Sequence, residues 1–220
     1  MARVIGIMGE SGSGKTTSMR NLDPKTTFYI DCDKKGLSWK GWRNQYNEKA
    51  KNYFRTNMVG TVATLLDKIN KQDNMKHIKV VVIDTLNGLM VADEMRRSKE
   101  KGFDKWQDLA QCIWRIVDVA YMLRPDLTII FMAHTQTERD DSGYLFTRIK
   151  TSGKKLEKIC LESKFTTVLI AKCKDGEYVF ETHAKNSTAK SPMGLFEQDE
   201  IPNDITEVIK ALEAYENEEE

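Results

Sequence analysis

The segment formed by residues 9–16, GESGSGKT, lies between a short apolar run and a stretch with helical character. It matches the pattern G-x-x-x-x-G-K-[ST] at every fixed position. In this pattern the glycines allow consecutive backbone N–H groups to surround a phosphate, the lysine reaches the outer phosphates, and the hydroxyl ligates Mg²⁺. The segment therefore predicts a phosphate-binding loop between a strand and a helix. The predicted nucleotide ligands are Gly9, Glu10, Ser11, Gly12, Ser13, Gly14, Lys15, Thr16 and Thr17.

The rest of the chain alternates between strand-like and helix-like segments. The predicted strands are residues 3–8, 27–31, 79–84 and 127–133, and the predicted helices are residues 16–21, 62–69 and 106–120. Two later runs, 167–174 and 177–182, flank Asp175-Gly176, a strong hairpin signal. A last amphipathic helix follows Asp204. We therefore predict one α/β domain over residues 1–212, with a mostly parallel twisted sheet flanked by helices and a C-terminal antiparallel hairpin, followed by an acidic tail at 213–220.

Composition restricts the class of protein. The chain has 220 residues and a net charge of +1, which argues against binding nucleic acid by bulk positive charge. The longest apolar runs, residues 80–83 and 129–133, are far shorter than the roughly 20 residues that cross a bilayer. No signal peptide fits before the first predicted strand. We therefore expect a cytoplasmic protein without membrane contact.

Asp84 ends the buried run VVVI. Its carboxylate should emerge at the carboxyl edge of the sheet, where open α/β folds bind ligands. A carboxylate at this place would hold Mg²⁺ through a water, as in the Walker B motif. The alternative role is a helix N-cap. We predict that Thr16 and Asp84 are the metal ligands.

Three runs at the ends of predicted strands carry a family resemblance: FYIDCD at 28–33, VVIDTL at 81–86 and IIFMAHTQ at 129–136. Together with the phosphate-binding loop they resemble the core of the RecA superfamily of ATPases. The length of the chain and its lysine-bearing segment at 186–192 are similar to the short, core-only RecA-like proteins of phages that act in single-strand annealing and recombination. The resemblance covers roughly residues 3–195 and implies a RecA-like P-loop NTPase core that uses ATP and Mg²⁺.

The resemblance implies catalytic roles for polar residues that follow the core strands. Lys15 would bind the β- and γ-phosphates. Asp33 stands where the family usually has the glutamate that polarises the attacking water, and Asp31 is its competitor for this role. The shorter side chain implies an inward shift of the loop or slow hydrolysis, because a general base must reach the water. Gln136, with His134 as the second choice, would sense the γ-phosphate.

The resemblance also implies self-assembly into a filament or ring, with nucleotide bound between adjacent subunits. A lysine from the segment after the hairpin, Lys185 or Lys190, would reach the neighbouring subunit's nucleotide as a lysine finger. An ordinary exposed lysine is the alternative for either residue.

RecA-like proteins hold single-stranded DNA with loops that follow the Walker B strand and the sensor strand. The corresponding segments here, residues 87–105 and 139–158, interleave basic residues with aromatics, which suits single strands because cations follow phosphates and rings stack on bases. A solvated lysine-rich surface is the alternative. The predicted DNA contacts are Arg96, Arg97, Lys99, Lys101, Tyr144, Phe146, Arg148, Lys150, Lys154 and Lys155.

These features together predict an Mg²⁺-dependent, DNA-stimulated ATPase that binds single-stranded DNA and promotes annealing or strand exchange in phage-type recombination. A single-strand-binding protein is a candidate partner. Two other classes remain open, because one fold hosts many functions. The first is a motor or regulatory P-loop ATPase, such as a helicase, a loader or a packaging motor. The second is a small-molecule kinase, whose lid would have to use the adjacent pair Arg96-Arg97.

Overall fold

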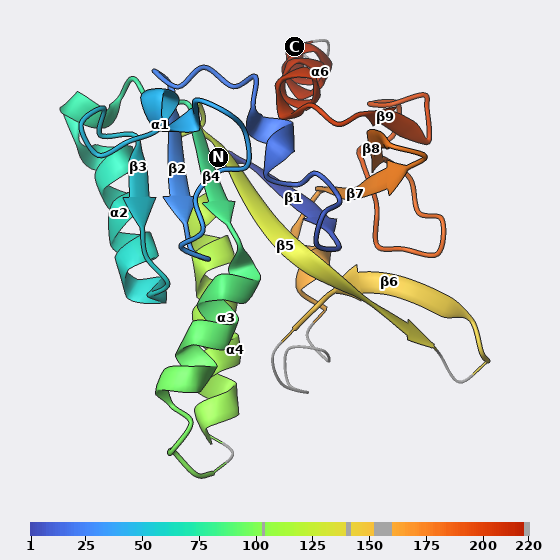
Figure 1. Ribbon diagram of the computed structural model, residues 1–220, viewed down its shortest axis with the longest axis horizontal. Helices are drawn as coiled ribbons and strands as arrows, with labels where there is room; N and C mark the ends of the chain where they lie inside the picture. Colours follow the sequence, from blue (N-terminus) through green and yellow to red (C-terminus); the bar gives the residue numbers. More distant parts are fainter. Residues whose placement is uncertain (103, 140–141, 152–159, 218–220) are drawn as a thin grey trace.

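The computed structural model describes residues 1–102, 104–139, 142–151 and 160–217. A nine-stranded sheet forms the centre of this described part (Figure 1). The strands are β1 (Arg3–Gly9), β2 (Thr27–Asp31), β3 (Tyr53–Arg55), β4 (Val80–Asp84), β5 (Thr128–Arg139), β6 (Leu145–Ile149), β7 (Thr167–Lys174), β8 (Glu177–Glu181) and β9 (Glu200–Pro202). The helices are η1 (Thr17–Met19), α1 (Trp42–Gln45), α2 (Val59–Lys71), η2 (Asp73–Met75), α3 (Leu86–Arg96), α4 (Asp104–Tyr121), η3 (Leu161–Lys164) and α6 (Ile205–Asn217).

The strand order is β3-β2-β4-β5-β1-β7-β8-β9, and β6 pairs with β5 outside this path. All neighbours from β3 to β7 run parallel, whereas β8 and β9 add an antiparallel edge. Parallel strands are covered on both faces, which is why their sequences are continuously apolar. The arrangement confirms the predicted fold class, an α/β domain with a mostly parallel sheet flanked by helices and a C-terminal antiparallel hairpin.

Alternate side chains of each central strand enter two separate cores. Val81 and Ile83 of β4 pack under α2, α3 and α4, whereas Val82 packs on the other face with η1, α1 and α6. The sheet is therefore a layer between two sets of helices. Among the described helices, none is long and apolar enough to pass through a membrane.

The predicted hairpin is confirmed: β7 and β8 pair antiparallel around Asp175 and Gly176, whose φ angles of 51° and 87° suit a two-residue turn. The final helix is also present, and Asp204 Oδ1 accepts a hydrogen bond from Thr206 N at its start. This helix continues to Asn217, so it includes the first five residues of the segment predicted as an acidic tail.

Three expected boundaries were wrong. Instead of a helix over residues 16–21, only the short 3₁₀ turn η1 follows the phosphate-binding loop. The fourth strand does not end at Ala133 but continues as β5 to Arg139, because β6 pairs with its second half. The first expected DNA loop, residues 87–105, consists largely of α3 and the start of α4.

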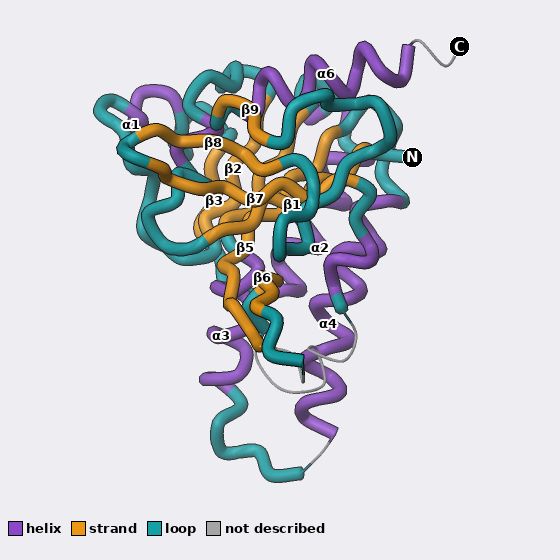
Figure 2. The backbone as a smooth tube through the Cα atoms, turned by 90° about the vertical axis from the view of Figure 1, so that its right-hand side faces the viewer, coloured by secondary structure: helices purple, strands orange, loops and turns teal. Residues whose placement is uncertain are grey.

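Two projections leave the body of the domain on the side where the parallel strands end (Figures 1 and 2). One is formed by α3 and α4, which extend together beyond the sheet. The other is the β5–β6 hairpin. Both projections begin at the sheet edge that carries the phosphate-binding loop. This loop therefore lies at the base of each projection.

Candidate active site

The phosphate-binding loop joins β1 to η1 at the carboxyl edge of the sheet. Gly12 and Gly14 have φ angles of 81° and 90°, which glycine adopts without the strain that a Cβ would add. A Cβ on Gly14 would also lie 2.7 Å from Cδ1 of Tyr178, a β8 residue whose ring stands beside the loop. The loop therefore needs glycine at this position for both conformation and space.

Lys15 is directed across the loop. Its ammonium group donates to the carbonyl oxygens of Gly9 and Glu10, both at 2.7 Å, and lies 3.5 Å from His134 Nδ1. Burial lowers the pKa of Lys15 to about 8, although Asp84 opposes this shift. Burial and the charge of Lys15 also lower the pKa of His134, which favours the neutral imidazole that can accept a hydrogen bond from the lysine.

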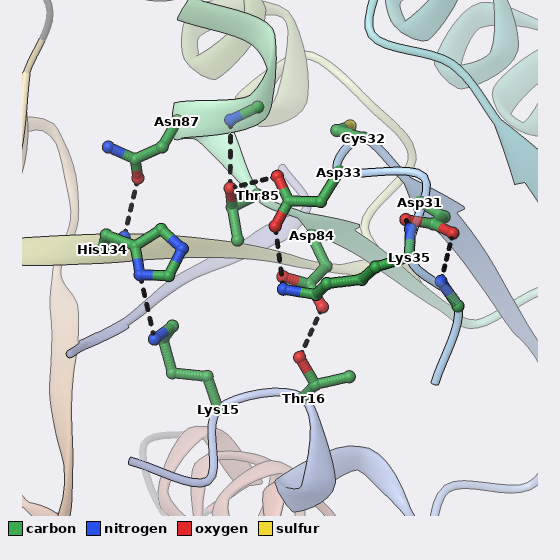
Figure 3. A network of polar contacts seen from close by, with 12 residues as sticks. Lys15, Thr16, Asp31, Cys32, Asp33, Lys35, Asp84, Thr85, Asn87 and His134 are labelled. Atoms are coloured by element: carbon green, nitrogen blue, oxygen red, sulfur yellow. Dashed lines mark hydrogen bonds and ion pairs between the residues drawn. The ribbon is translucent and has the colours of Figure 1, made fainter. Parts of the chain in front are cut away.

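Asp84 and Thr16 meet where the loop faces β4 (Figure 3). Thr16 Oγ1 donates to Asp84 Oδ2 at 2.6 Å, and the hydroxyl of Tyr29 donates to the same oxygen at 3.1 Å. Asp84 is fully buried, and this burial raises its pKa although Lys35 opposes the shift. The other oxygen, Asp84 Oδ1, is buried and has no hydrogen-bond partner within the described part of the chain. A hydroxyl and a carboxylate with one unused oxygen fit Mg²⁺, which prefers oxygen ligands.

Asp33 lies beside this pair and is held from two sides. Thr85 Oγ1 donates to Asp33 Oδ1 at 2.9 Å, and Lys35 Nζ lies 2.8 Å from Asp33 Oδ2. The same Thr85 oxygen accepts a hydrogen bond from Gly88 N and so caps α3. Burial alone would lower the pKa of Lys35, but Asp84 and Asp33 outweigh it and raise this pKa. The start of α3 therefore fixes the carboxylate of Asp33.

Asp31, the competitor for the role of general base, is occupied by hydrogen bonds within its own loop and with β3. It is fully buried and accepts hydrogen bonds from the backbone N–H groups of Lys35 and Gly36 and from the hydroxyl of Tyr53. These bonds hold the loop that carries Asp33. Of the two aspartates, Asp33 is the one whose carboxylate contacts the side chains of Lys35 and Thr85 (Figure 3).

His134 and Gln136 have different surroundings, although both lie on β5. His134 contacts Lys15, and its backbone N–H donates to Asn87 Oδ1 at 2.7 Å. The Nε2 of Gln136 donates instead to Glu138 within the β5–β6 hairpin. The structure thus brings His134 to the phosphate-binding loop and places Gln136 farther along the hairpin.

A hollow of about 280 Å³ lies over this group of residues. Its lining includes Lys15, Thr16, Lys35 and His134 from the polar cluster and Tyr178 from β8. A second hollow of about 350 Å³ lies on the other side of the loop, between residues 9–13 and the end of β7. The first hollow contains the lysine and the hydroxyl that the phosphate-binding motif requires.

The two candidate finger lysines lie outside this cluster. Lys185 Nζ is 2.7 Å from Asp199 Oδ2 and is therefore engaged in an ion pair on its own chain. Lys190 pairs through its backbone with Val168 of β7. Either role in a neighbouring subunit's site stays a prediction.

The predicted DNA contacts fall into three groups. Arg96, Arg97 and Arg148 face carboxylates: Arg96 lies 3.5 Å from Asp93, Arg97 2.7 Å from Glu100, and Arg148 3.8 Å from Glu138. Lys99, Lys101, Tyr144 and Lys150 are exposed, as Arg96 is, and Phe146 of β6 is half-buried. Lys154 and Lys155 lie outside the described residues.

Sequence reasoning missed four residues of the cluster: Tyr29, Lys35, Thr85 and Asn87. Thr85 follows Asp84 directly and Asn87 comes shortly after it, so their places at the start of a helix could have been inferred. Lys35 lies two residues after Asp33 in a charged run that resembles any solvated turn. Tyr29 reaches Asp84 only because β2 and β4 are neighbours, which no local pattern reveals.

Comparison with known proteins adds a family. The model of a family described as AAA domain (AAA_24) matches residues 1–193. No curated protein matches the chain. Among solved structures, the crystal structure of a KaiC-like protein from the hyperthermophilic archaeon Pyrococcus horikoshii is similar, with a TM-score of 0.45 and 12% sequence identity over 81% of this chain and 77% of that chain.

Proposed function

Since the chain belongs to the AAA domain family and is a P-loop ATPase, we propose that it hydrolyses ATP with Mg²⁺ and couples this activity to single-stranded DNA, promoting annealing or strand exchange. One observation carries the ATPase part. Lys15, Thr16, Asp84 and Asp33, four residues from three separate segments, converge at one edge of the sheet. Phosphoryl transfer requires positioning and charge stabilisation from such a set.

Each residue has a definite task in this proposal. Lys15 binds the outer phosphates, and Thr16 and Asp84 would hold the metal. When bound, Mg²⁺ neutralises charge on the phosphates. Asp33 orients the attacking water and accepts its proton, since its carboxylate is fixed by Thr85 at 2.9 Å beside the hollow.

The DNA part rests on the two projections. Both leave the sheet edge that carries the phosphate-binding loop, and exposed cations or rings lie on each of them. Because three predicted arginines face carboxylates, we assign the contacts to Lys99 and Lys101 beyond α3 and to Tyr144 and Lys150 at the two ends of β6. Flexible cations with an exposed ring suit single strands, which are bound by phosphate contact and base stacking.

A matched pair of double variants tests this assignment. The variant Lys99→Ala/Lys101→Ala should bind single-stranded DNA more weakly in a mobility shift with ATP. Its affinity should also depend less steeply on salt concentration, by the equivalent of about two released counterions. The control, Lys25→Ala/Lys49→Ala, changes two exposed lysines that precede β2 and β3 at the opposite edge of the sheet. Equal DNA binding and equal annealing of complementary strands by both variants would contradict the assignment.

The kinase alternative is less favoured by the contacts of its required arginines. Arg96 lies 3.5 Å from Asp93, and Arg97 lies 2.7 Å from Glu100 and 3.2 Å from Asp108. The Arg96 ion pair lies within α3, whereas Arg97, the residue after α3, joins the connection that follows the helix to α4. A kinase lid would instead need both guanidinium groups over the phosphates.

A further inference from the structure

Lys35 occupies an unexpected place for a residue in a charged turn. Its Nζ lies 2.8 Å from Asp33 Oδ2, and its side chain, 48% exposed, lines the same hollow as Lys15 and Thr16. Figure 3 shows the side chain reaching from its loop toward Asp33 and Asp84. The backbone of this loop is fixed, because Asp31 accepts hydrogen bonds from the N–H groups of Lys35 and Gly36 at 3.2 and 2.8 Å. A rigid backbone thus presents an adaptable cation to the phosphate site.

We propose that Lys35 contacts the γ-phosphate of ATP bound to its own subunit and serves as a catalytic cation. This proposal rests on the proposed ATPase function. An ammonium group has three N–H donors, so Lys35 can keep its contact with Asp33 and direct the other donors toward phosphate oxygens. A cation that bridges the base and the γ-phosphate would hold both at the distance that water attack needs.

The balance of charge supports this role. Among the described residues that line the hollow, the two cationic side chains are Lys15 and Lys35. They face the carboxylates of Asp33 and Asp84, so the four side chains sum to zero before any phosphate is added. Lys15 is held by two carbonyl oxygens at the base of the loop. Lys15 approaches the phosphates from the loop, so Lys35 is the second cation, on the side of Asp33, when charge develops on the γ-phosphate.

The reaction can be written with these groups. The oxygen of water forms a bond to the γ-phosphorus, and the bond from that phosphorus to the bridging oxygen breaks. The electron pair of the broken bond stays on the β-phosphate of ADP. The proton of water passes to the carboxylate of Asp33. Lys35 stabilises the negative charge on the γ-phosphoryl oxygens during this transfer, as cations do in other phosphoryl transfers.

The test compares neighbouring lysines. Lys35→Ala should lower kcat for ATP about 100-fold, the loss expected for one stabilising donor, and weaken ATP binding without changing ADP binding. Lys35→Arg should recover part of kcat because it restores the charge. Lys34→Asn is the control: Lys34 is exposed, and its φ of 59° lies in the left-handed region that asparagine tolerates. This control should keep wild-type kcat.

A mixing experiment tests whether Lys35 acts within its own subunit. A mixture of the Lys35→Ala protein and the Lys15→Ala protein should be no more active than the two proteins assayed separately, because every site then lacks one of two lysines that must come from the same chain. Recovery of activity on mixing would show that Lys35 acts on a neighbour and would overturn the proposal. Wild-type kcat in Lys35→Ala would also overturn it, whereas absence of hydrolysis by the wild-type protein would overturn the ATPase function itself.

Discussion

Gly88 offers a sharp test of the link between α3 and the general base. A Cβ at this position would lie 2.3 Å from Asp33 Oδ1 and 2.9 Å from the carbonyl oxygen of Cys32. Because such contacts below 3.0 Å essentially never occur, Asp33 Oδ1 must retreat by at least about 0.7 Å in a Gly88→Ala variant. Asp33 cannot retreat freely, since Thr85 and Lys35 hold its two oxygens.

We expect Gly88→Ala to lower kcat roughly 10- to 100-fold with little change in KM for ATP, because a displacement approaching 1 Å misplaces a catalytic group without removing the phosphate ligands. Overpacking should also lower the free energy of unfolding by about 1–3 kcal/mol. Steady-state ATP hydrolysis and urea denaturation measure the two effects.

Gly60 of α2 provides the control, because a Cβ there meets no atom within 4 Å. Gly60→Ala should therefore stabilise the protein by about 0.5–1 kcal/mol and leave kcat unchanged. If Gly88→Ala matched Gly60→Ala in both kcat and stability, the reasoning that α3 positions Asp33 would be refuted.

Three further results are expected. Asp84→Asn removes a buried charge, so the free energy of unfolding, measured by denaturation, should stay unchanged or rise by about 1 kcal/mol. In the same variant, nucleotide titration should show that ATP affinity in Mg²⁺ falls at least about tenfold. Asn87→Ala should cost about 2 kcal/mol in urea denaturation, since the N–H of His134 and the carbonyl of Lys150 lose their partner. ATP affinity should be constant below pH 8 and fall up to about tenfold per pH unit above it, because the pKa of Lys15 is about 8 and the charged lysine is the form that binds phosphate. Calorimetry at pH 9 should detect the proton taken up on binding, and Lys15→Met should abolish that uptake.

The central strands could be predicted because they are apolar on both faces. The expected strand at residues 27–31 coincides with β2, and the one at residues 79–84 differs from β4 by one residue. The phosphate-binding loop could be predicted because its glycines, lysine and hydroxyl lie in one short segment. The position of Asp84 at the carboxyl edge of the sheet could be predicted because it ends a buried strand.

What could not be predicted depends on contacts between distant segments. The polar half of β5 forms a strand because β6 supplies its hydrogen bonds. The sequence around Gln136 has no apolar run from which this part of the strand could be predicted. The sequence around Asp31 and Asp33 could not show which of them is the general base, because the hydroxyl that donates to Asp31 comes from Tyr53 on β3. The position of the Lys35 side chain could not be predicted either, because it depends on the fold of the loop that Asp31 holds.

Phosphate release from ATP, followed with and without single-stranded DNA, tests the central claim most directly. The account predicts Mg²⁺-dependent turnover by the wild-type protein that rises with DNA, and loss of this turnover in both Lys15→Ala and Asp33→Asn. Turnover at the wild-type rate in either variant, or no turnover by the wild-type protein, would contradict the assignment of this cluster as an ATPase site.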